Sequence, residues 1–66
     1  MTDMEKLAHL LAHWRAHNDE HAANYRTWAQ RAEAAGQKDA ARFLSQAADD
    51  TDKISKLFED ARDSLK

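Results

Sequence analysis

Proline and glycine, the residues that most readily interrupt a helix, are almost missing from this chain. It has no proline and a single glycine, Gly36, near the middle of its 66 residues. Alanine, leucine, arginine, lysine, glutamine and glutamate dominate, and all of them favour helix. Isoleucine occurs once and valine never, and no strand-type alternation is present. The sequence therefore predicts an all-α chain of two helices, at about 3–35 and 38–65, that turn back at Gly36.

The expected helix ends carry capping signals. Residues 2–5 read TDME, a capping box in which the Thr2 hydroxyl accepts from the Glu5 backbone N–H and the Glu5 side chain reaches back. Gly36 can adopt the left-handed conformation that ends many helices, and Asp39 suits the cap or first turn of the second helix. Because the connection is short, we expect residues 1–66 to form one domain, an antiparallel helical hairpin.

Apolar positions recur at alternating steps of three and four, which is the heptad pattern of a coiled coil. In the first helix the expected core positions are Met4, Leu7, Leu11, Trp14, Asn18, His21, Tyr25, Trp28, Ala32 and Ala35. In the second helix they are Ala40, Leu44, Ala47, Thr51, Ile54, Phe58, Ala61 and Leu65. Pairing across the turn places residue i near residue 75 − i, so that Trp28 is expected to face Ala47 and Trp14 to face Ala61.

The hydrophobic core of a chain of this size gives only marginal stability unless a disulfide, a metal ion or self-association adds to it. It has no cysteine, so that neither a disulfide nor a thiolate metal site can stabilise it. Leu10, Phe43 and Leu57 also widen the apolar stripe beyond what a two-helix seam requires. We therefore expect a homodimer of hairpins that forms a four-helix bundle.

Charge and hydropathy exclude several classes of partner. The net charge is −2, and the ten basic and twelve acidic residues are interspersed, so that we expect no nucleic-acid partner. The longest apolar runs have three residues, which excludes a membrane span and the core of a signal peptide. A cytoplasmic location is the default expectation. Asp49 with Lys53, and Asp52 with Lys56, are expected to form ion pairs four residues apart.

The four histidines fall at 9, 13, 17 and 21, each one helical turn after the last. Residues four apart on a helix lie about 5–6 Å apart and can chelate one ion, whereas residues eight apart are too distant. The heptad count puts His9 and His13 on the outside, His17 at the edge of the seam and His21 in the core. His21 and Asn18 are then expected to form a polar layer that needs partners.

A dimer can supply those partners. If two copies of the first helix pack antiparallel with their midpoints aligned, residue i meets residue 38 − i, and His17 of one chain meets His21 of the other. Up to four imidazoles can then surround one zinc, cobalt, nickel or copper ion. Glu20 and Asp19 are candidate additional ligands or hydrogen-bond acceptors. His13 can form a second pair with His17, and Asp50 is the one carboxylate candidate on the second helix.

These patterns predict a small dimeric metal-binding protein, a carrier, buffer or sensor for a transition-metal ion, whose affinity falls as pH drops below about 6.5, the pKa of free histidine. The alternative is a structural or protein-interaction module in which a buried His/Asn layer sets register and pH response. Trp14, Tyr25 and Trp28 are expected in the core. No catalytic motif is found, and the Glu-x-x-His motif of carboxylate bundle sites is absent, so that we do not expect an enzyme.

The string HWRAHNDEH, residues 13–21, followed by YRTWA, residues 25–29, resembles a group of small, uncharacterised bacterial and archaeal helical proteins. They carry H-W-x-x-H-N-x-x-H, then an aromatic residue three positions before the tryptophan of W-A, then a glycine turn. The resemblance covers about the middle third of the chain. It implies that His13, His17 and His21 form the signature and that His9 lies outside it.

Overall fold

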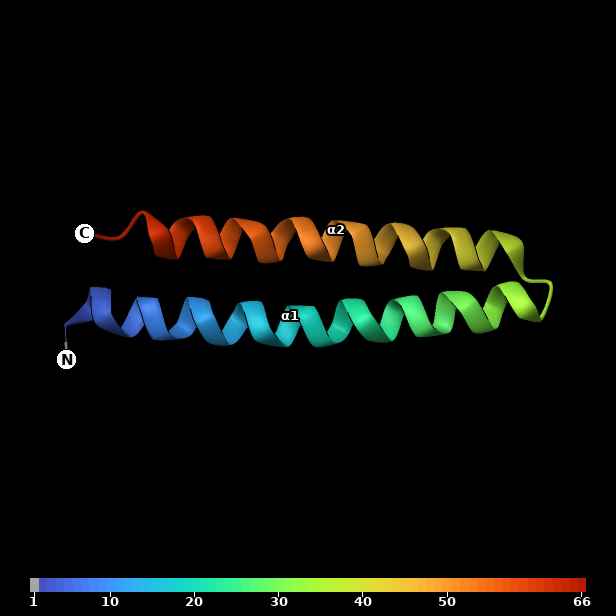
Figure 1. The fold of residues 1–66 in the computed structure, drawn as a ribbon, viewed down its shortest axis with the longest axis horizontal. Helices are drawn as coiled ribbons and strands as arrows, with labels where there is room; N and C mark the ends of the chain where they lie inside the picture. The colour runs from blue at the N-terminus through green and yellow to red at the C-terminus, as the bar shows by residue number, and fades with distance from the viewer. Residues whose placement is uncertain (1) are drawn as a thin grey trace.

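The computed structural model describes residues 2–66 as two antiparallel helices that lie side by side (Figure 1). Helix α1 spans Asp3–Ala34 and helix α2 spans Lys38–Asp63. The beginning of α1 and the end of α2 lie at one end of the hairpin, and the turn lies at the other. The predicted all-α antiparallel hairpin is therefore confirmed, and each helix ends one or two residues earlier than expected.

Local hydrogen bonds explain where the helices begin and end. The Thr2 hydroxyl accepts from the Glu5 backbone N–H at 3.2 Å and donates to the Glu5 carboxylate at 3.1 Å, so that the predicted cap is present. After Ala35, Gly36 has φ +81°. The Gln37 N–H donates to the Ala32 carbonyl at 2.8 Å, and the Gly36 N–H donates to the Glu33 carbonyl at 3.0 Å. These two hydrogen bonds form a Schellman motif. The motif favours glycine at this position because glycine has no Cβ and readily adopts a positive φ.

The register of the hairpin agrees with the sequence prediction. Arg26 donates to Asp49 at 3.1 Å, and Arg15 lies 3.6 Å from Glu59. Both pairs join residues whose numbers add up to 74 or 75, so that residue i of α1 lies level with about residue 75 − i of α2.

About half of the predicted core positions are buried or half-buried, and the rest are exposed. On α1, Leu11 is buried, and Leu7, Asn18, Tyr25 and Ala32 are half-buried; on α2, Leu44, Ala47, Thr51 and Phe58 are half-buried, as is Leu65 just beyond its end. A second set of core positions is displaced by one residue. The buried residues there are Ala22, Ala29, Ala41, Ala48 and Ser55, where His21, Trp28, Ala40, Ala47 and Ile54 had been predicted.

The physical reason for this displacement is size. Helix axes approach most closely where the residues between them are small, and alanine or serine lies directly after each predicted core residue of the displaced set. As a result Trp28 is 57% exposed and Ile54 is 44% exposed. The prediction that Trp28 faces Ala47 inside the hairpin is therefore wrong. Trp14 packs on Phe58, with ring centroids 5.8 Å apart.

The hairpin has two unlike sides beyond the seam. The charged side carries the ion pairs that Arg15 makes with Glu59 and that Arg26 makes with Asp49 and Asp52. The helical repeat places most of the remaining large apolar residues on the other side. On this apolar side lie Leu7, Leu10, Trp14, His17, His21, Asn24, Trp28 and Arg31 of α1, and Ala40, Phe43, Ala47, Asp50, Ile54, Leu57 and Ala61 of α2, followed by Ser64 at its C-cap.

Neither helix in the described part of the chain combines the length and apolar character that crossing a membrane requires.

The small-residue seam generates a first prediction. Ala48 is 0% exposed, so that Ala48→Leu should lower the free energy of unfolding by about 1–3 kcal/mol through overpacking. Ala23→Leu, on the exposed surface of α1, should change it by less than about 0.5 kcal/mol. Urea denaturation at fixed protein concentration measures both values. Equal effects for the two variants would show that the helices do not pack through this seam.

The buried serine generates a second prediction. The Ser55 hydroxyl is buried and has no hydrogen-bond partner among the described residues. Ser55→Ala should therefore raise the free energy of unfolding by about 1 kcal/mol more than Ser45→Ala, which changes an exposed serine of the same helix. Thermal melts of the two variants test this. A loss of stability in Ser55→Ala would indicate that the hydroxyl does have a partner.

Candidate metal centre

The four histidines form a ladder of exposed rings along α1. The ring centroids of His13 and His17 lie 6.2 Å apart, those of His17 and His21 lie 4.4 Å apart, and those of His21 and Tyr25 lie 6.0 Å apart. The closest histidine pair is thus His17 and His21, the pair that the sequence predicted as ligands.

The geometry of this pair is compatible with two imidazole nitrogens that bind one metal ion. The two rings are tilted by 49° to each other, so that their edges can converge on a common point. Two nitrogens bound to one tetrahedral ion lie about 3.3 Å apart, as follows from metal–nitrogen bonds of about 2.0–2.1 Å. Small rotamer adjustments of rings already this close can reach that separation. The wider pair of His13 and His17 would have to close further.

One expected feature of this site is wrong. His21 was predicted in the core beside Asn18, but it is exposed, because Ala22 takes the seam position. Asn18 is half-buried at the seam. The two residues therefore do not form a buried polar layer within one hairpin, and the imidazoles of His17 and His21 lie on the apolar side.

The predicted carboxylate ligands are not gathered around the imidazoles. Among the described residues, no group of three or more histidine, cysteine, aspartate or glutamate side chains is placed to hold a metal ion. Asp19 lies 3.8 Å from Arg15, and Glu20 is exposed. Asp50 accepts from the Gln46 side chain at 2.9 Å. Within one chain, the close ring pair of His17 and His21 is therefore the densest group of potential ligands, and no carboxylate joins it.

Large apolar side chains surround the pair. Leu10, Trp14 and Trp28 of α1, together with Phe43, Ile54 and Leu57 of α2, are each 40% to 66% exposed, and all lie on the apolar side. Arg31 stacks over Trp28, with its guanidinium carbon 4.7 Å from the ring centroid. Sequence reasoning predicted the wide apolar stripe, but it missed that both tryptophans are exposed in the hairpin.

The charged side has a different organisation. Arg26 bridges two carboxylates of α2, and the hydrogen bonds that it donates to Asp52 and to Asp49 raise the pKa of Arg26 above its ordinary value. The sequence missed this bridge and predicted the wrong ion pairs for α2. Asp49 and Asp52 pair with Arg26, while Lys53 lies near Asp50 and Lys56 lies 2.9 Å from Asp60. The hydrogen bond and charge of Asp60 likewise raise the pKa of Lys56.

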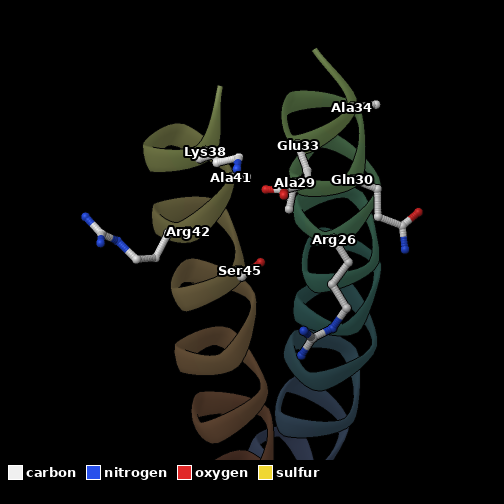
Figure 2. Close-up of a pocket in the computed structure, with 9 residues that line it drawn as sticks. All are labelled: Arg26, Ala29, Gln30, Glu33, Ala34, Lys38, Ala41, Arg42 and Ser45. Atoms are coloured by element: carbon white, nitrogen blue, oxygen red, sulfur yellow. The ribbon is translucent and has the colours of Figure 1, made fainter. Parts of the chain in front are cut away.

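An open groove of about 590 Å³ lies on the charged side near the turn (Figure 2). Glu33 and Lys38 extend into the gap between the helices, whereas Arg42 and Gln30 point outward on opposite flanks. Its cationic groups do not converge on a common point, and Arg26 is already paired with acids. The groove therefore has no arrangement that would hold one ligand.

The structure thus defines a class: an antiparallel helical hairpin that presents paired imidazoles on an apolar side. Residues 7–65 match the family described as a domain of unknown function (DUF8180), and the chain belongs to this family. No curated protein and no solved structure matches it. The resemblance to small proteins with an H-W-x-x-H-N-x-x-H signature stays a prediction.

Proposed function

We propose that this protein binds a divalent transition-metal ion through His17 and His21 in a homodimer, and acts as a carrier, buffer or sensor for that ion. The observation that supports this proposal most strongly is the 4.4 Å separation of the two rings. Both rings lie on the same exposed side of one rigid helix, which limits the entropy lost when they bind a shared ion.

The imidazole chemistry of His17 and His21 limits which metal ions the pair can bind. Imidazole nitrogen binds zinc, nickel, copper and cobalt, whereas magnesium and calcium prefer oxygen ligands. The chain has no cysteine, so that thiolate-dependent sites are excluded. His13 is placed as a rim ligand that can pair with His17, and Glu20 is a candidate for an outer hydrogen bond to an imidazole N–H.

Two imidazoles leave a four-coordinate ion with two open positions. Water can occupy them, but an ion held by only two exposed ligands binds weakly. A second copy of the chain can contribute another His17 and His21, which is why the proposal includes a homodimer and the four-helix bundle that it would form.

The second candidate function is a protein-interaction module, and the exposed apolar side favours it. Here the histidines would contribute polarity and pH response to an interface, and metal would have no role. The two functions differ in one property, since an ion that binds only the native protein raises its melting temperature. The cytoplasmic location stays a prediction.

Removal of the imidazole pair generates a third prediction. Calorimetric titration with zinc, nickel, cobalt and copper should detect binding by the wild type, and His17→Ala/His21→Ala should weaken it by at least about 100-fold, because each lost ligand removes several kcal/mol of binding free energy. The control variant His9→Ala, which removes an exposed imidazole outside the proposed site, should keep most of the affinity. If His17→Ala/His21→Ala binds these ions as tightly as the wild type, His17 and His21 are not the metal ligands.

The pH dependence of binding generates a fourth prediction. Protons compete with the ion for the same imidazole nitrogens, so that affinity should be highest where the imidazoles are neutral and should fall as the solution becomes acidic. Between about pH 7.5 and about pH 5.5 the loss should be tenfold or more for a ligand set of histidines. An affinity that stays constant over this interval would indicate carboxylate ligands instead.

A further inference from the structure

The apolar side of α1 has a heptad repeat of its own. Its residues Leu7, Leu10, Trp14, His17, His21, Asn24, Trp28 and Arg31 follow one another at alternating steps of three and four. The hairpin seam uses a different set of α1 residues. Helix α1 therefore presents a second coiled-coil stripe that no element of its own chain covers.

A stripe of this kind can pair with a copy of itself in antiparallel orientation. In such a pairing, each a position of one helix lies opposite a d position of the other. Because the helices run in opposite directions, the two residue numbers in every layer add up to the same sum. For a sum of 38 the layers join Leu10 to Trp28 and His17 to His21, each formed twice by symmetry. Between these two layers Trp14 joins Asn24, and in the outermost layer Leu7 joins Arg31. The symmetry axis then passes α1 near residue 19, close to the middle of Asp3–Ala34.

The apolar side of helix α2 is compatible with the same axis. Its apolar-side residues repeat at steps of three and four as well, and the layer that joins Ile54 to Leu57 has a sum of 111. The axis on α2 therefore lies between residues 55 and 56. Arg26–Asp49 and Arg15–Glu59 show that this height is level with residue 19 to 20 of α1. One two-fold axis thus serves both helices.

Size and charge also fit a second copy. The hairpin measures 51 × 15 × 11 Å, so that its broad side offers a second copy a surface that runs the full length of both helices. The side carries one cation, Arg31, and one anion, Asp50, as an interface between identical copies requires if it is not to repel itself. The imidazoles occupy the centre, and tryptophans occupy both flanks.

We propose that the apolar side docks a second copy of this chain, with α1 packed antiparallel on α1 of the other copy at the sum of 38. This places His17 and His21 of both copies around one point and Ile54 and Leu57 of both copies beside them. This proposal depends on the proposed function only where it concerns the ion that the histidines bind. The apolar layers form with or without metal.

Spin labels measure this register directly, because the chain has no cysteine and each label site is unique. Lys6→Cys and Thr27→Cys place labels on exposed positions of α1 away from both seams. The sum of 38 separates the two Lys6 sites by about 39 Å along the axis and the two Thr27 sites by about 24 Å, from a rise of 1.5 Å per residue. The difference of about 15 Å is the signature of the proposed docking.

Other registers give other differences. A shift by one heptad to a sum of 45 gives about 36 Å, and a shift to a sum of 31 makes the Thr27 pair the longer one. A dimer with parallel α1 helices gives nearly equal distances for the two sites. Any of these results overturns the proposal, as does a molecular mass of one chain in sedimentation equilibrium both with zinc and with chelator.

A substitution on α2 tests the same surface. Leu57→Glu should weaken dimerisation by tenfold or more, because it buries a carboxylate in the central apolar layer, whereas Ala23→Glu makes the same change of net charge on an exposed position outside the interface and should leave dimerisation intact. Since Leu57 is 64% exposed in the hairpin, its replacement does not disturb folding within one chain. Equal dimerisation of both variants overturns the proposal.

The experiment also separates the interface from the metal. A dimer with the predicted label distances in chelator supports the docking even if no ion binds. A monomer that still loses zinc affinity in His17→Ala/His21→Ala overturns the docking and leaves the histidine clamp in place. Capture of a different protein by the apolar side, with no self-association, also overturns it.

Discussion

The close contact of small side chains along the hairpin seam determines where every larger residue lies. Ala22 and Ala29 of α1 pack against α2 at the positions of Ala41, Ala48 and Ser55, and these five residues are all buried. Burying alanine stabilises a helix pair less than burying leucine or tryptophan does, since the hydrophobic contribution scales with the apolar area removed from water. The seam therefore positions the helices closely, but it supplies only a modest part of the stability that a chain of this size needs.

The consequence of a small-residue seam is an apolar side that still carries its large residues. Trp14, Trp28, Phe43, Ile54 and Leu57 remain partly exposed beside the seam. In the proposed dimer these residues become the second core, and the paired imidazoles lie at its centre. Stability and metal binding then depend on the same contact between copies, and association would order the ligands while it buries the apolar surface.

The sequence predicted the features that depend on local chemistry. The Thr2 cap, the Gly36 turn and the hairpin register follow from capping, left-handed glycine and a short connection. The closeness of His17 and His21 follows from helical spacing. Only about half of the seam positions could be predicted from the sequence, because each helix carries two candidate stripes of seam residues that are displaced by one residue. Hydrophobicity favours Trp28 over Ala29, and the close approach of two helix axes favours the reverse, which a single helix does not reveal.

The central claim is that His17 and His21 of two chains share one ion. Native mass spectrometry of the untagged protein in the presence of zinc measures the number of chains and ions in one species. The account predicts two chains with one ion, and two chains without an ion for His17→Ala/His21→Ala. A single chain that binds no zinc, or a double variant that retains the ion, would contradict it.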